Sequence, residues 1–144
     1  MKIVSGLMLC MFLVSCNIEQ TTTDTPPEIN EATTQAVLDR HWETFKNNDL
    51  EGVMADYDES SVLITPDKTY SGLAEIRQNF VNAFAVFPKD SSTMTLQQSV
   101  VKGDLAYIIW SADAPRLKLD FGTDTFVVRD GKIVRQTYAG VVGE

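Results

Sequence analysis

The stretch "TDTFVVRDGKIVRQT", residues 123–137, decides the fold of this chain. Two segments rich in β-branched and aromatic residues flank the pair Asp130-Gly131, and such a pair suits a two-residue type I′ hairpin. The pattern therefore predicts two antiparallel strands in which Arg129 pairs with Lys132.

The hairpin also sorts its side chains by face, because successive residues of a strand point to opposite sides of the sheet. We expect the set containing Asp124 and Arg135 to face away from the core, since these diagonal neighbours can form an exposed ion pair. That outer set also holds Phe126, Val128 and Ile133, which predicts a covered surface and a homodimer interface. The inner set, expected to face the helices, comprises Phe121, Thr123, Thr125, Val127, Val134, Gln136, Tyr138 and Gly140.

Two more strands are predicted before the hairpin, at 92–101 and 105–114. Like the hairpin strands themselves, 117–129 and 132–142, these segments are rich in β-branched and aromatic residues. The turn-forming sequences KGD, APR and DG separate them. Strands joined by such short turns predict an antiparallel meander.

Residues 28–91 carry a helical pattern instead. With Asn30 as the N-cap, apolar residues then recur at steps of three or four, which predicts an amphipathic helix. His41, the only histidine, lies in the middle of its apolar stripe, with Trp42 at the edge. The stripe comprises Thr34, Val37, Leu38, His41 and Phe45.

Two further helices follow. Asp49 is the expected N-cap of a short second helix, and Gly72 with Glu75 starts a third that Pro88 ends. Between them, "SVLIT" at 61–65 reads as a strand stopped by a proline. Helices followed by a meander predict an α+β domain, with three N-terminal helices packed on one face of a curved, mainly antiparallel sheet.

The N-terminus indicates a lipoprotein. Residues 1–15 combine a basic start with the apolar run "IVSGLMLCMFLV", which is typical of a secretory signal peptide. "LVSC" at 13–16 resembles a bacterial lipobox, so we expect Cys16 to be lipidated and residues 16–27 to form a polar tether. An ordinary secretory signal is the alternative. The domain is expected over 28–144, outside the cytoplasm, at the outer membrane if the host has one.

Composition excludes several classes of function. The formal net charge is −8, so we expect no nucleic-acid partner, and contact with the membrane only through the lipid anchor. Cys10 leaves with the signal and Cys16 carries lipid, so the domain has no thiol chemistry. The acidic cluster Asp56, Asp58 and Glu59 lacks the spacing of an EF-hand and reads as a solvated helix end. We expect no metal and no cofactor, because nucleotide and dinucleotide motifs are missing too.

Three stretches of the chain resemble the SnoaL-like branch of the nuclear transport factor 2-like superfamily. They are "W…F…DLEGVMADYDESSVLITP" (42–66), "YSGLAEIRQNF" (70–80) and "TDTFVVRDGKIVRQT" (123–137). The resemblance implies three helices against a strongly curved sheet, which close a cone able to hold a small, largely apolar molecule. It does not select a chemistry, because the superfamily includes isomerases, dehydratases, cyclases and binding domains.

The expected faces nominate residues for this cone. The pocket candidates are His41, Trp42, Tyr57, Phe84, Trp110, Asp113, Thr123, Thr125, Gln136 and Tyr138. Each also has a plain structural interpretation, and His41 alone is a candidate catalytic residue.

Three hypotheses follow from these expectations. The first is a protein that binds a small apolar molecule without transforming it. The second is a cofactor-free lyase or isomerase in which His41 or a buried aspartate moves a proton. The third is a dimeric interaction module whose cone is filled by its own aromatic side chains.

Overall fold

The computed structural model describes residues 29–143, so the predicted signal peptide and the predicted lipidation of Cys16 lie outside the described residues. Three helices occur, α1 (Glu31–Lys46), α2 (Leu50–Met54) and α3 (Gly72–Val86). The strands are β1 (Val62–Ile64), β2 (Thr69–Ser71), β3 (Thr93–Lys102), β4 (Leu105–Ala114), β5 (Leu117–Arg129) and β6 (Lys132–Val142). The predicted elements and the α+β class are confirmed.

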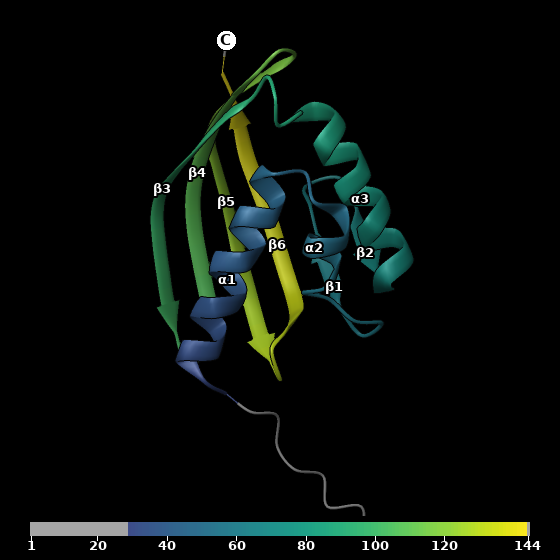
Figure 1. The fold of residues 1–144 in the computed structure, drawn as a ribbon, viewed down its shortest axis with the longest axis vertical. Helices are drawn as coiled ribbons and strands as arrows, with labels where there is room; N and C mark the ends of the chain where they lie inside the picture. Colours follow the sequence, from purple (N-terminus) through teal and green to yellow (C-terminus); the bar gives the residue numbers. More distant parts are fainter. Residues whose placement is uncertain (1–28, 144) are drawn as a thin grey trace, which may run out of the picture.

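The strands form one six-stranded sheet in the order β2-β1-β6-β5-β4-β3. Only the β1–β6 pair is parallel. Figure 1 shows α1 running across the sheet, while α3 stands beside β1 and β2. The sheet and these two helices therefore enclose the interior from different sides.

No helix within residues 29–143 has the length and apolar content needed to cross a membrane.

The helices begin where the polar residues predict. Asn30 Oδ1 accepts hydrogen bonds from the backbone N–H groups of Ala32 and Thr33, at 3.0 and 3.2 Å. Asp49 caps α2 in the same way, through Gly52 N–H at 2.9 Å. These caps satisfy backbone donors that a helix leaves unpaired in its first turn. They fix the start of α1, and with it the direction in which His41 points.

The turn between β5 and β6 has the predicted conformation. Asp130 and Gly131 have φ angles of 51° and 72°, the positive values that a type I′ turn requires. Arg129 pairs with Lys132 as expected.

The predicted assignment of faces is wrong for β5. Beyond the turn, Val127 pairs with Arg135 and Val128 with Ile133, so Val134 is an extra residue without a partner. Such a bulge shifts the register by one residue and turns the rest of one strand over relative to the other. As a result Gln136 and Tyr138 of β6 face inward as expected, but β5 is inverted. Its inner residues are Gly122, Asp124, Phe126 and Val128.

Two further predictions fail for the same reason. The expected ion pair between Asp124 and Arg135 does not form, because Asp124 is buried on the inner face while Arg135 is exposed. Phe126, Val128 and Ile133 cannot form a homodimer interface, since they are 2%, 2% and 0% exposed within a single chain.

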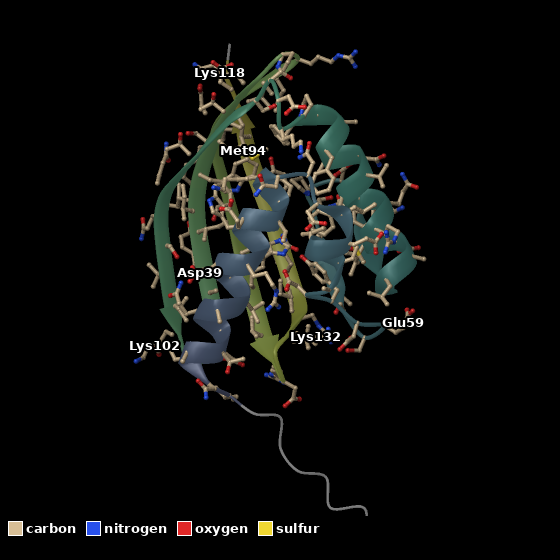
Figure 2. All side chains as sticks on the ribbon, in the orientation of Figure 1. Asp39, Glu59, Met94, Lys102, Lys118 and Lys132 are labelled. Atoms are coloured by element: carbon tan, nitrogen blue, oxygen red, sulfur yellow. The ribbon has the colours of Figure 1, made fainter. Side chains whose placement is uncertain are left out.

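The interior lies between the sheet and the helices. Figure 2 shows side chains filling the space between α1, α3 and the sheet, with Lys102 and Lys118 at opposite ends of the molecule. Each layer contributes large apolar residues, and this burial is the main favourable term for folding. They include Val37 and Leu38 of α1, Ile76 and Phe80 of α3, Ile108 and Trp110 of β4, and Phe126 of β5.

Candidate functional site

A cavity of about 380 Å³ opens between α1, α3 and the inner face of the sheet. This volume lies within the range of small-molecule sites. Exposed residues of α3, of the β1–β2 turn and of the β6 end lie at its mouth, among them Asn82, Asp67 and Val142. Deeper in, most of the wall is aromatic, formed by Trp42, Phe45, Tyr70, Phe80, Phe87, Trp110, Phe126 and Tyr138.

His41 forms part of the inner wall and is held by a carboxylate. It is 4% exposed, and its Nδ1 lies 3.0 Å from Oδ2 of Asp56, which is fully buried. Arg40 donates to the other oxygen of Asp56 through Nε, at 2.7 Å, and through Nη2. Because Nδ1 is engaged by Asp56, Nε2 is the nitrogen left to meet a bound molecule.

Three aromatic rings fix the plane of the His41 imidazole. The rings of Tyr57, Phe80 and Phe126 meet it edge to face, at centroid distances of 5.7, 5.7 and 5.3 Å. Packing and the Asp56 contact thus orient the same side chain, which limits its rotation.

Asp124 is a second buried carboxyl group in the wall. Its Oδ1 accepts a hydrogen bond from Gln136 Nε2–H and its Oδ2 one from Trp110 Nε1–H, both at 2.8 Å. Burial raises the pKa of Asp124 above its ordinary value of 3.8, while these two donors and the nearby His41 act in the opposite direction. Asp124 therefore keeps its proton to higher pH than an exposed aspartate does.

Two tyrosines complete the polar groups of the site. The Tyr57 hydroxyl donates to Gln136 Oε1, which fixes the amide so that its nitrogen faces Asp124. Burial, with the nearby Asp124 charge, raises the pKa of both Tyr57 and Tyr138 above the ordinary 10.0. Both hydroxyl groups therefore remain protonated at neutral pH, and Tyr138 is one of the residues that line the cavity.

The sequence-predicted pocket residues fall into three groups. Five line the cavity: His41, Trp42, Trp110, Gln136 and Tyr138. Two pack behind its wall instead: Tyr57 bonds Gln136, and the Phe84 ring lies 5.8 Å from that of Phe45. Three lie elsewhere. Thr123 and Thr125 face outward because β5 is inverted, and Asp113 is exposed beside Lys118 at the end of the sheet.

Sequence reasoning missed the two aspartates of the site. Asp56 was interpreted as part of a solvated helix end, yet it is fully buried against His41 and Arg40. Asp124 was assigned to the outer face. A usable signal was the alternation Gly122, Asp124, Phe126 and Val128, whose last two members are large and apolar.

The described residues hold no group of three or more histidine, cysteine, aspartate or glutamate side chains placed to bind a metal ion. The lining of the cavity also contains no lysine or arginine within the part of the chain that the structure describes. Among the described residues, the titratable side chains of the lining are those of His41, Asp67, Tyr70, Asp124 and Tyr138.

The curved sheet and the three helices form a fold that is also found in solved structures described as nuclear transport factor 2-like and as cystatin-like. The chain belongs to the SnoaL-like domain family, whose family model matches residues 38–136. A search of curated proteins finds no significant match.

Solved structures resemble this chain at low sequence identity. A candidate ketosteroid isomerase from Kribbella flavida superposes with a TM-score of 0.68 and 18% identity, over 81% of this chain and 83% of that one. A candidate polyketide cyclase from Sinorhizobium meliloti gives 0.63 and 18%, over 72% and 94%. A cystatin-like protein of unknown function from Methylobium petroleophilum gives 0.65 and 16%, over 83% and 82%. Likeness at this level establishes the fold.

Proposed function

We propose that the cavity binds a small, largely apolar molecule and that His41 moves a proton on it, without a cofactor. The observation that carries this proposal is the contact of His41 Nδ1 with Asp56 at 3.0 Å in the cavity wall. A carboxylate on one imidazole nitrogen holds the ring in the tautomer whose other nitrogen can accept a proton. The reaction class is therefore an isomerisation, a dehydration or a cyclisation.

The groups around His41 suggest how the charge would be handled. When Nε2 takes a proton from a carbon next to a carbonyl group, the electron pair moves to the carbonyl oxygen. The Tyr138 hydroxyl is a donor that can stabilise this oxygen, since burial raises its pKa. Asp124, whose pKa burial also raises, can donate to the same oxygen when it carries a proton. The proton on His41 then returns to another atom of the same molecule, or to a leaving hydroxyl group.

The cavity wall also favours one class of ligand. Aromatic side chains dominate it, and its two acidic residues are Asp67 and Asp124. A carboxylate or phosphate would meet no lysine or arginine among the described residues of the lining. We therefore propose a neutral molecule with one or two polar atoms.

The names of two structural neighbours fit this proposal. One is a candidate ketosteroid isomerase and the other a candidate polyketide cyclase. Their titles describe those proteins, and they support the reaction class here only by likeness of fold.

Native mass spectrometry of the protein purified from its own host tests the binding step. We expect a co-purifying neutral small molecule on the wild type, and its loss when Ala83→Trp fills the cavity from α3. Identification of that molecule then allows turnover to be compared between the wild type and His41→Asn. Equal turnover by the two proteins would remove the proposed role of His41.

Binding without turnover is the second candidate, favoured by the largely aromatic wall. It predicts that the co-purified molecule is released unchanged and that no incubation with wild-type protein converts it. The open cavity argues against the third hypothesis, in which the protein's own aromatic side chains fill the cone.

We also propose that the domain is tethered outside the cytoplasm by lipid on Cys16. The lipobox-like "LVSC" supports this anchor, and the polar residues 17–27 supply the tether. Helix α1 then begins at Glu31, close behind the tether.

A further inference from the structure

A row of three paired residues crosses the sheet on adjacent strands, beside the cavity that Trp110 lines. Trp110 of β4 pairs with Gly122 of β5, and Gly122 pairs in turn with Gly140 of β6. Two of the three positions therefore carry no side chain, and this stretch of the inner sheet face is bare backbone.

Large side chains lie on this bare stretch. A methyl group added at Gly122 would stand 2.9 Å from Trp110 Cε2, 3.1 Å from Trp110 Nε1 and 2.8 Å from Leu119 Cδ2. The first and last of these distances are below any normal carbon–carbon contact, so the indole could not stay where it is. Neither glycine has a positive φ, and the need for glycine here is therefore one of space.

The position of the indole matters because of the bond that it makes. Trp110 reaches across β5, past Gly122, and its Nε1–H donates to Asp124 Oδ2 at 2.8 Å. Asp124 is the next inward residue after Gly122 on the same strand. The indole is held from its other side by the rings of Trp42, Phe45 and Phe87, at centroid distances of 5.9, 5.8 and 5.6 Å. The indole therefore has little space into which it could move away from a side chain at position 122.

We propose that Gly122 is a positioning residue of the site: its missing side chain lets the Trp110 indole lie flat on β5, so that the indole N–H holds the carboxyl group of Asp124 in the cavity wall. The catalytic importance of this arrangement rests on the proposed function, in which Asp124 stabilises the charge that develops on the substrate. The arrangement itself can be tested without a substrate.

The experiment uses the indole N–H signals in the ¹H–¹⁵N spectrum of the purified protein. The chain has only two tryptophans, so Trp42→Phe identifies the Trp110 signal by elimination. In the wild-type background, Asp124→Asn should shift this signal strongly, because it changes the group that accepts the bond. In the Gly122→Ala background the signal should already be displaced upfield, and Asp124→Asn should no longer shift it.

Gly140→Ala is the matched control. A methyl group there meets Leu119 at 2.8 Å, as one at Gly122 does, and the Tyr138 hydroxyl oxygen at 2.6 Å, but not Trp110. The Trp110 signal of this variant should still respond to Asp124→Asn. A Gly122→Ala protein whose Trp110 signal keeps its wild-type position and its response to Asp124→Asn would overturn the proposal.

A third variant decides the case in which Gly122→Ala does not fold. Trp110→Phe removes the indole atoms that the new methyl group would strike and leaves, of the three nearest atoms, only Leu119 Cδ2 at 2.8 Å. Gly122→Ala should therefore lower the melting temperature clearly less in the Trp110→Phe background than in the wild-type background. If Gly122→Ala is equally damaging with Phe at position 110, the indole is not the reason for the glycine, and the proposal fails. None of these results depends on turnover, so they are independent of the proposed function.

Discussion

At the scale of single residues, the site contains two buried aspartate carboxyl groups. Asp56 accepts hydrogen bonds from Arg40 and contacts His41, and Asp124 accepts them from Trp110 and Gln136. A buried carboxylate is costly unless it is paired or hydrogen-bonded, and each of these has partners on both oxygens. The chain thus retains two groups that burial alone would disfavour, Asp124 in the cavity wall and Asp56 behind His41.

The raised pKa of Asp124 predicts how stability depends on pH. Folding raises this pKa above 3.8, so the folded protein binds the proton more tightly than the unfolded chain does. The stabilising contribution is therefore complete below the ordinary aspartate pKa and is lost as pH rises through the folded pKa. As the pH rises from the ordinary aspartate pKa through the folded pKa of Asp124, we expect the free energy of unfolding of the wild type to fall relative to that of Asp124→Asn.

Urea denaturation of both proteins at a series of pH values measures this difference. Taking the difference cancels the contributions of the other titrating groups, which both proteins share. A difference that stays constant or grows with pH would show that folding does not raise the pKa of Asp124.

Residue-scale prediction from sequence succeeded where a periodic pattern fixed the direction of a side chain. The helical stripe placed His41 inward, and it is buried. It failed for Asp56 and Asp124, because a charged residue is normally exposed and the donors that satisfy it come from distant positions. Gln136 and Trp110, for example, lie 12 and 14 residues from Asp124 and on other strands.

The β5–β6 hairpin shows the same contrast at the scale of an element. Its turn and first pair follow from the local Asp-Gly sequence, and both are confirmed. The bulge at Val134 has no such local signature. The position of the bulge depends instead on which face of β5 is buried. Burial of Phe126 and Val128 stabilises the fold by more than the burial of Asp124 costs.

Deletion of Val134 should therefore cost little more than its truncation. Without the extra residue, Arg135 follows Ile133 directly and still pairs with Val127, so Gln136 stays opposite Phe126 and keeps its bonds to Tyr57 and Asp124. We expect both the deletion and Val134→Ala to cost about 1 kcal/mol. Each buried polar group left unpaired would add about 1–3 kcal/mol to this loss. Thermal denaturation compares the two variants, and a much larger loss for the deletion would mean that the bulge itself holds Gln136 on the inner face.

At the scale of the whole molecule, the family resemblance predicted the curved sheet and the cone, and the fold agrees. The placement of pocket residues was only partly predictable, since it depends on one bulge, at Val134, just beyond the turn that set the expected register.

We still propose a homodimer, now through the true outer face of the sheet. Apolar side chains remain exposed there, with Val100 47%, Leu105 44% and Val141 61% exposed. Burying them against a second copy would be favourable, whereas a charge placed among them would be costly. We expect sedimentation to show a dimer for the wild type and a folded monomer for Val100→Glu. Val81→Glu, on α3, is the control and should remain dimeric. A monomeric wild type would remove the proposal.

Membrane attachment depends on a single residue in our account. Cys16→Ser removes the lipid acceptor, and the described residues offer no helix that could span a membrane. We expect the variant to move from the membrane to the soluble extracytoplasmic fraction on cell fractionation. Retention on membranes through a high-salt wash would contradict the anchor.

Proton exchange tests the central claim, that His41 moves a proton on a molecule bound in the cavity. Small neutral apolar ketones are incubated with the purified protein in D₂O, and NMR follows replacement of the hydrogens next to the carbonyl group. We predict that the wild type accelerates exchange of at least one ketone that it binds, and that His41→Asn binds the same ketone but exchanges it about 10²–10⁴-fold more slowly. Equal exchange by the two proteins, or no acceleration for any ketone that enters the cavity, would contradict the account.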